Sequence, residues 1–167
     1  MTELSDLYSD RIMELAAAIP PARHLERPDA VASAHSKLCG STISIELMLD
    51  GDVVTDYAHV VKACLLGQAA ASVVAANVIG STEAEIRRAA GEMRRMLKEN
   101  GPAPSGKWAD LGVLEPVREV KGRHASTLLA FDAILRAFDA REAANGPSAT
   151  GTSNPGTSTA AAAPAGA

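Results

Sequence analysis

The part of the chain that most limits its fold is a predicted β-hairpin near the middle. From residue 43 to residue 49, isoleucine and leucine alternate with serine, glutamate and methionine, which is the period of a strand with one buried face. Asp50-Gly51 follows, and this dipeptide is a strong signal for a tight turn. Residues 53–61 then read as a second strand, antiparallel to the first.

Both cysteines of the chain flank this hairpin. Cys39 precedes the first strand, and Cys64 follows the second. A two-residue loop places Cys39 opposite Lys62, and a three-residue loop places it opposite Ala63. The apolar pattern of the second strand does not choose between these registers. In both, the two cysteines meet at the open end of the hairpin.

Helical periodicity surrounds the hairpin. Helices are expected at about residues 6–19, 67–79, 82–100 and 126–143, and a short edge strand at 31–35. The second helix carries small and apolar residues on all sides, which indicates burial. Thr82 and Glu85 form a capping box at the start of the third helix. Residues 101–123 are predicted to be mostly loop, pinned to the core by residues such as Trp108 and Leu111.

The chain divides into one domain and a tail. Residues 145–167 contain no charge and no large apolar side chain, so they have nothing to bury and are expected to be disordered. Residues 1–144 are long enough for one domain with its own core.

Composition excludes several functions. A net charge of −4 with 3% aromatic residues gives no support for nucleic-acid binding. There is no apolar run of the roughly 18 residues that a membrane span needs. The acidic N-terminus does not look like a signal peptide. We therefore expect a cytoplasmic protein, in which two neighbouring cysteines act as thiols, metal ligands or redox groups rather than as a structural disulfide.

Cys64 stands directly before the predicted buried helix. A helix N-terminus carries free N–H groups and partial positive charge, which predicts a lowered pKa and a nucleophilic thiolate at Cys64. Two thiolates alone do not complete a four-coordinate zinc or iron site. Candidates for the remaining ligands are His124, His35, His59, Asp56 and Ser126, although Ser126 also suits the N-cap of the last helix. The absence of Cys-x-x-Cys disfavours a simple thiol oxidoreductase.

Three stretches together resemble a known family. They are Leu38-Cys39-Gly40-Ser41, Leu49-Asp50-Gly51-Asp52-Val53-Val54, and Ala63-Cys64 followed by a helix of small residues. This pattern resembles the U-type iron–sulfur scaffold family, which includes IscU, SufU and the N-terminal domain of NifU. Residues 111–134, with Arg123 at the arginine of an Arg-x-x-Cys motif, look like the SufU branch in particular. The resemblance covers about residues 5–140.

Two positions depart from the family pattern. Cys39 and Cys64 match its first and second cysteines, but Ser41 stands where the family has a ligand aspartate and Ser126 where it has a third cysteine. A neutral hydroxyl is a poorer metal ligand than thiolate or carboxylate. His124, two positions before Ser126, is a candidate for the missing ligand. Ser41 and Ser126 remain weaker candidates.

The resemblance implies an α+β fold, with a small antiparallel sheet of about three strands and helices packed on one side. It also implies a scaffold or carrier, not an enzyme, in iron–sulfur cluster assembly. Cys39 and Cys64 would hold iron or a transient [2Fe–2S] cluster, and Cys64 would accept the persulfide. Implied partners are a cysteine desulfurase and acceptor apo-proteins, with a cluster shared by two protomers of a homodimer. Two alternatives stay open: a zinc-binding persulfide relay using Cys39, Cys64 and His124, and an interaction module that binds no metal.

Overall fold

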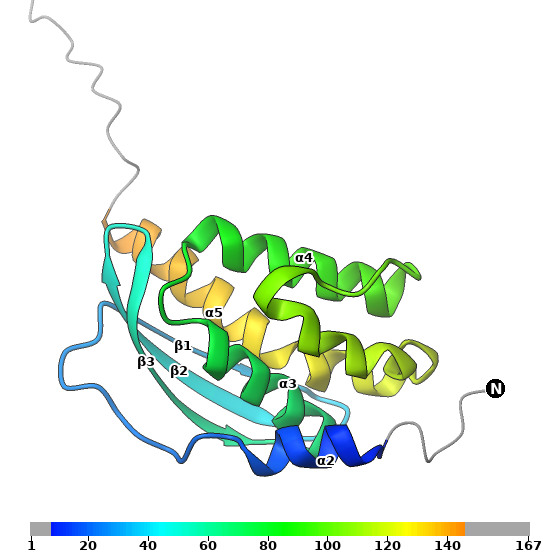
Figure 1. Cartoon of the computed structure of the whole chain (residues 1–167). Coiled ribbons are helices and arrows are strands. Elements are labelled where there is room, and N and C mark those ends of the chain that lie inside the picture. The colour runs from blue at the N-terminus through cyan, green and yellow to red at the C-terminus, as the bar shows by residue number, and fades with distance from the viewer. Residues whose placement is uncertain (1–7, 146–167) are drawn as a thin grey trace, which may run out of the picture.

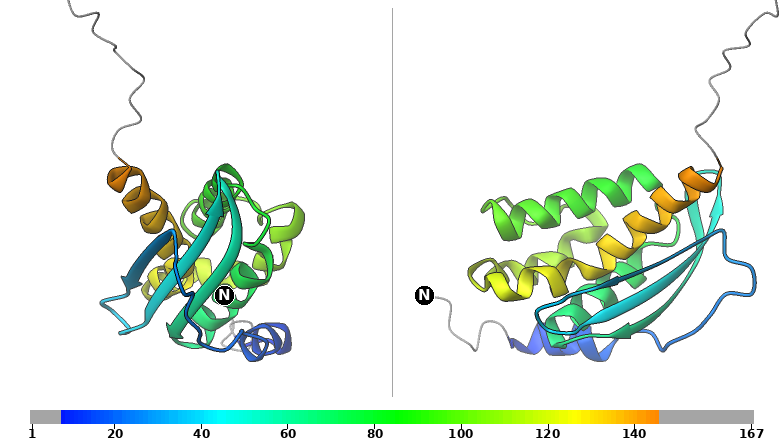
Figure 2. Two further views of the ribbon diagram at one scale, coloured as in Figure 1. Left: turned by 90° about the vertical axis from the view of Figure 1, so that its left-hand side faces the viewer. Right: turned by 180° about the vertical axis from the view of Figure 1, so that it is seen from behind.

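The computed structural model describes residues 8–145, which form a three-stranded antiparallel sheet with helices packed against one side (Figure 1). The strand order is β1-β2-β3. In chain order the elements are α2 (Asp10–Ala17), β1 (Ala30–His35), β2 (Thr42–Asp50), β3 (Val53–Lys62), α3 (Leu65–Asn77), α4 (Glu83–Lys98), the 3₁₀ helices η1 (Gly106–Glu119) and η2 (Lys121–Arg123), and α5 (His124–Ala144). The predicted α+β class and its one-sided arrangement are confirmed; Figure 2 shows the sheet and the helices as two layers.

The hairpin turn lies one residue later than predicted. Asp50 pairs with Val53, so Gly51 and Asp52 are the two loop residues. Gly51 has a φ of 62°, a left-handed conformation that glycine adopts without steric cost. Both registers expected from the sequence are therefore wrong, because each assumed that the loop began at Asp50.

A second irregularity lies within the hairpin. Between Met48 and Leu49 the pairing shifts, and beyond this point Leu47 stands opposite Tyr57. Directly opposed residues of an antiparallel pair point to the same face, so the shift turns Tyr57 towards the core beside Leu47. This bulge explains why the apolar pattern of the second strand fitted neither simple register.

The core fills the space between the sheet and the helices. Helix α5 packs on β1 and β2, and α3 and α4 pack on α5. The predicted capping box is present at α4, where the Thr82 hydroxyl accepts the Glu85 N–H and the Glu85 carboxylate accepts the Thr82 N–H. The largest fully buried side chains include Trp108, Phe131, Phe138, Ile12, Ile45 and Met93.

Residues 101–123, expected to be mostly loop, contain two 3₁₀ helices instead. Trp108, Leu111, Leu114 and Val117 in η1 are all buried. Their spacing of three residues equals the period of a 3₁₀ helix, so all four point to the same side. The pattern was visible in the sequence, but an unusually long 3₁₀ segment carrying Pro116 does not match the usual helical spacing.

Several predicted boundaries also need correction. Helix α2 starts at Asp10, where Ser9 caps it by accepting the Ile12 N–H; the predicted start at residue 6 lies outside the described residues. The last helix starts at His124, so Ser126 lies in its first turn and is not the N-cap. The predicted tail from 145 lies, except for Asn145, outside the described residues, and the division into residues 1–144 and 145–167 stays a prediction.

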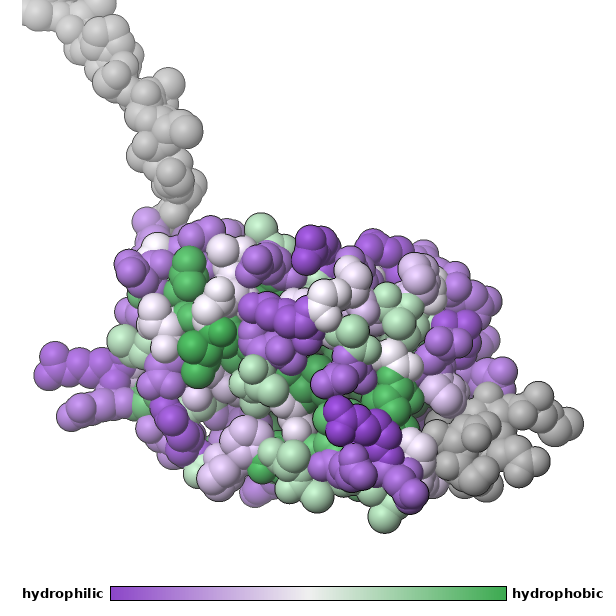
Figure 3. Space-filling view, in the orientation of Figure 1, coloured by the Kyte–Doolittle hydropathy of each residue, from purple (hydrophilic) through white to green (hydrophobic). Residues whose placement is uncertain are grey.

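The surface shows no large apolar face in the orientation of Figure 3. Hydrophilic residues spread over α4, and apolar residues occur in separate areas below it. Between residues 8 and 145, no helix has the length and apolar composition that crossing a membrane requires.

Candidate functional site

The two cysteines lie at the open end of the hairpin, as predicted. The β2–β3 ladder begins with Thr42 paired to Lys62; Cys39 lies just before it and Cys64 just after it. Cys64 is the N-cap residue of α3, as expected from the sequence, but its side chain makes no capping hydrogen bond. Both thiols are free and partly exposed. The opposite end of the sheet is the turn, where Arg141 near the end of α5 donates to the Gly51 carbonyl (2.9 Å).

One serine hydroxyl connects the two cysteine segments. The Cys39 thiol donates to Ser41 Oγ at 3.0 Å, and the Cys64 main-chain N–H donates to the same oxygen at 3.3 Å. Ser41 is buried. The side chain that replaces the family's aspartate therefore fixes the approach of one cysteine to the other without adding a charge.

A second serine, on α5, reaches the same place. The Cys64 thiol donates to Ser126 Oγ at 3.5 Å, and Ser126 Oγ donates to the Arg123 carbonyl at 3.1 Å. Ser126 is only 1% exposed. Gly67 makes this contact between α3 and α5 close, because a Cβ there would lie 3.1 Å from the Ser126 carbonyl oxygen. The first turn of α5 therefore completes the site.

Hydroxyl groups lower the pKa of the Cys39 thiol. The hydroxyl of Ser36 has the largest effect, followed by that of Ser41; burial opposes them, and Ser126 contributes less, so that the pKa falls from 9.0 to about 6. Ser36 is 2% exposed, and its hydroxyl has no other hydrogen-bond partner among the described residues, which leaves it available to a thiolate at Cys39. The sequence singled out Cys64 as the reactive thiol, which stays a prediction; the lowered pKa of Cys39 is a feature that the sequence did not indicate.

Cys39 also lies beside an open hollow in the surface. It lines an open hollow of about 410 Å³ together with Leu38, Val120, Gly122 and Arg123, and Cys64 is not part of this lining. Leu38, at the tip of the loop, is 79% exposed. The hollow therefore gives a molecule from solvent a route to the Cys39 thiol.

The structure does not bring His124 into a ligand set with the cysteines. Its ring is buried, and Nε2 lies 3.0 Å from the carbonyl oxygens of both Val117 and Arg118. Across residues 8–145, no three side chains of the types His, Cys, Asp and Glu are grouped so that they could hold a metal ion. The site thus offers two thiols surrounded by neutral hydroxyls.

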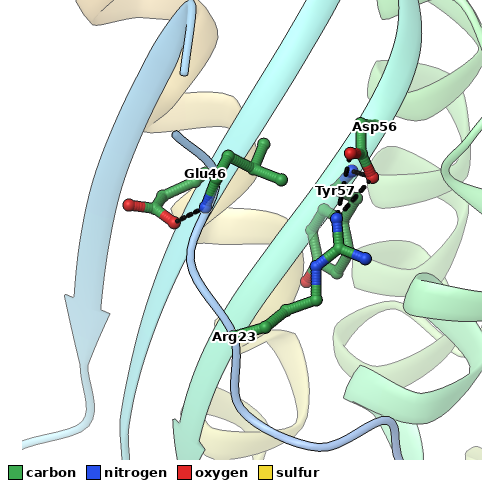
Figure 4. Close-up of polar contacts among 5 residues, drawn as sticks. Arg23, Glu46, Asp56 and Tyr57 are labelled. Carbon is green, nitrogen blue, oxygen red and sulfur yellow. Dashed lines mark hydrogen bonds and ion pairs between the residues drawn. The ribbon is translucent and has the colours of Figure 1, made fainter. Parts of the chain in front are cut away.

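Two other candidate ligands serve a different part of the fold. The Asp56 carboxylate accepts two hydrogen bonds from the Arg23 guanidinium, at 2.8 and 2.9 Å, and one from the Tyr57 N–H (Figure 4). His59 is buried, with Nε2 3.0 Å from the Pro20 carbonyl oxygen. Both hold the segment between α2 and β1 against the sheet. His35, the remaining candidate, is an exposed residue at the end of β1.

Sequence reasoning missed Ser36 and Gly67. Ser36 is an ordinary serine three residues before Cys39, and only the folded loop turns its hydroxyl inwards. Gly67 was noticed as part of a small-residue helix, but its contact with Ser126 joins segments far apart in the chain. No local pattern signals either role.

The fold and the site together define a class: an α+β domain that presents two thiols at the open end of a hairpin, against the first turn of its last helix. A crystal structure of a nitrogen-fixing NifU-like protein (N-terminal) from Brucella abortus is 54% identical to this chain, with a TM-score of 0.82. The match covers 84% of this chain and 97% of that one. The chain therefore belongs to the NifU-like, U-type iron–sulfur scaffold family.

A second crystal structure supports the fold alone. It is that of a protein described as an iron–sulfur cluster assembly scaffold for the SUF system, from Fervidobacterium islandicum. It is 19% identical, with a TM-score of 0.73, and the match covers 81% of this chain and 98% of that one. No protein-family model and no curated protein matches the chain.

Proposed function

We propose that this protein is a carrier of sulfur, or of a nascent iron–sulfur cluster, in cluster assembly, and that Cys39 and Cys64 hold the cargo. The observation that carries the proposal is the convergence of the two thiols on Ser41 and Ser126, in a chain of the scaffold family. The protein binds and passes on its cargo and is not a turnover enzyme. The remaining expectations from the resemblance belong to this proposal: a cytoplasmic location, a cysteine desulfurase as donor, and apo-proteins as acceptors.

The ligands that the chain supplies favour a cargo that is readily released. Thiolates are the ligands that iron–sulfur clusters prefer, and a [2Fe–2S] cluster takes four of them. One chain supplies two, Cys39 and Cys64, so a whole cluster requires a second protomer with its own pair. Serine hydroxyls beside the thiolates can donate hydrogen bonds to them but add no charge. This favours release of the cargo over its retention.

The zinc-relay alternative is less well supported. A structural zinc site needs four ligands, normally cysteine, histidine or carboxylate. Among residues 8–145, no third cysteine, histidine or carboxylate side chain joins the two cysteines, and the Nε2 atom of His124 lies against two main-chain carbonyl oxygens. The interaction-module alternative is also weaker, because a site without chemistry gives no reason for two free thiols bonded to buried serines.

Within the pair, we assign sulfur acceptance to Cys39 rather than to Cys64, which was the choice from sequence. Cys39 lines the open hollow, and its lowered pKa makes it a thiolate at neutral pH. Cys64 is the second ligand, next to Ser126.

The proposal is tested by measuring what the purified protein carries. The full chain is purified anaerobically, and iron, zinc and acid-labile sulfide are measured beside Cys39→Ala, Cys64→Ala and the control Ser33→Ala, which alters an exposed hydroxyl on β1. Iron with matching sulfide, or sulfane sulfur on Cys39, that is lost in the cysteine variants and kept in the control supports the carrier. One zinc per chain without sulfide supports the relay. A site that stays empty after reconstitution and takes up no sulfur leaves only the interaction module.

A further inference from the structure

We propose that Cys64 resolves a persulfide formed on Cys39, releasing sulfide and leaving a Cys39–Cys64 disulfide. The inference rests on the proposed function, because it needs Cys39 to receive sulfur. It adds the source of electrons: sulfane sulfur must gain two electrons before it can enter a cluster as sulfide. In this chain the two thiols themselves would supply them.

The two thiols are close enough to make resolution a local event. Ser41 Oγ is hydrogen-bonded to the Cys39 thiol and to the Cys64 N–H, at 3.0 and 3.3 Å. Ser126 Oγ lies 3.5 Å from Cys64 Sγ and also faces Cys39. A disulfide requires Cβ atoms about 4 Å apart, and the shared contacts with Ser41 and Ser126 bring the two cysteine segments together at one place.

The order of events follows from the hollow that Cys39 lines. This hollow is open to solvent, so an incoming sulfur donor can reach the Cys39 thiol there. Cys64 stands at the start of α3, next to the buried Ser126, and does not line this hollow. One thiol therefore receives, and the other resolves.

The chemistry balances in two steps. In the first, the Cys39 thiolate attacks the terminal sulfur of a persulfide donor, a Cys39–S–SH persulfide forms, and the donor leaves as a thiol. In the second, the Cys64 thiolate attacks the inner sulfur, Sγ of Cys39; the Cys39–Cys64 bond forms, the S–S bond of the persulfide breaks, and hydrosulfide leaves. The dithiol loses two electrons and the sulfane sulfur gains them. A dithiol reductant then restores both thiols.

The absence of a third ligand makes this reaction available. Among residues 8–145, no histidine, aspartate or glutamate joins the two cysteines in a ligand cluster. A metal held by both thiolates would block the attack of one on the other. With neutral Ser41 and Ser126 beside them, the thiols remain free for exchange, and the buried hydroxyl of Ser36, which has no other described partner, can donate to the sulfur on Cys39.

The experiment loads the reduced, metal-free full chain with glutathione persulfide under anaerobic conditions and removes the small molecules at once. Intact mass, a peptide map and released sulfide are then followed for the wild type, Cys64→Ser, Cys64→Ala and Ser33→Ala. In the wild type and in Ser33→Ala we expect one sulfide per chain, a mass lower by two hydrogen atoms, and a Cys39–Cys64 disulfide. In both Cys64 variants the added sulfur stays on Cys39, and sulfide release slows by at least about tenfold.

Failure of this inference and failure of the proposed function give different results. If wild-type Cys39 takes up sulfur and keeps it as long as the Cys64 variants do, resolution is refuted while the carrier function stands. If neither the wild type nor the variants gain sulfur at Cys39, uptake itself fails, and the inference falls with it. Even if a Cys64 variant does not fold, the amounts of sulfide and of Cys39–Cys64 disulfide formed per wild-type chain test the inference.

Discussion

Replacing Ser36 by alanine tests how much its hydroxyl lowers the pKa of the Cys39 thiol. The Ser36 hydroxyl is buried, has no other partner among the described residues, and is the largest cause of the lowered pKa of Cys39. Its main-chain bonds to Ser41 and Gly40, at 2.8 and 2.9 Å, do not involve the side chain. Ser36→Ala should therefore change the thiol and leave the loop in place.

The size of the effect follows from this geometry. A hydrogen bond to an ionised group contributes about 1.5–3 kcal/mol, and one pKa unit corresponds to about 1.36 kcal/mol. Because the hollow beside Cys39 is open to water, we take the lower end and expect its pKa to rise by roughly one unit from about 6. Near pH 6 the thiolate fraction then falls from roughly one half to roughly one tenth, which slows alkylation about fivefold.

The assay is site-resolved alkylation of the metal-free protein with iodoacetamide across a range of pH, read on the peptide that contains Cys39. Since a lowered pKa keeps the thiolate populated as pH falls, the wild-type rate should decline only through about pH 6, and the variant rate should decline at higher pH. The two rates converge in alkali, where both thiols are ionised. Near pH 5, where the Cys39 thiol is mostly protonated in both proteins, the free energy of unfolding should change by less than about 0.5 kcal/mol; near pH 8 it should fall by about 1.4 kcal/mol, because a pKa shift of one unit is linked to stability. Identical alkylation profiles for the variant and the wild type would refute the role of Ser36; Ser33→Ala is the control.

Three further predictions concern packing and ligands. Gly67→Ala places a Cβ 2.9 Å from Ala63 Cβ and 3.1 Å from the Ser126 carbonyl, and should lower the free energy of unfolding by about 1–3 kcal/mol in thermal denaturation, whereas Gly122→Ala, with nothing within 4 Å, should not. Trp108→Ala leaves a cavity beneath η1 and should cost about 3–5 kcal/mol in urea denaturation. Ser41→Asp combined with Ser126→Cys supplies a carboxylate and a third thiolate, and should tighten zinc binding at least about tenfold by calorimetry.

Each of these has an outcome that contradicts it. Equal melting temperatures for the Gly67 and Gly122 variants would mean that α3 and α5 do not meet as closely as described. A loss below about 1 kcal/mol for Trp108→Ala would show that η1 contributes little to the core. Unchanged zinc affinity in the double variant would mean that Ser41 and Ser126 do not face a shared space with the two thiols.

Much of the fold was predictable because its signals are local. The alternation in residues 43–49, the Asp50-Gly51 turn and the Thr82–Glu85 box each act within a few residues, and each marks an element that the structure contains. The exact pairing of β2 with β3 was not predictable, because a bulge and a turn shifted by one residue change the register without changing the composition. The 3₁₀ helix η1 was missed because its period of three is seldom sustained over 14 residues.

For the site, the sequence by itself determined that two cysteines meet at the end of a hairpin, and that serines stand where the scaffold family has an aspartate and a third cysteine. It could not show that the pKa of Cys39 is lowered, because that shift depends on hydroxyl groups brought together from separate segments. Ser36 and Ser41 come from the loop before β2, and Ser126 comes from α5 across the close contact at Gly67. Only the tertiary packing decides that Cys39 lines an open hollow with Val120 and Arg123, because a hollow is formed by segments that are far apart in the chain.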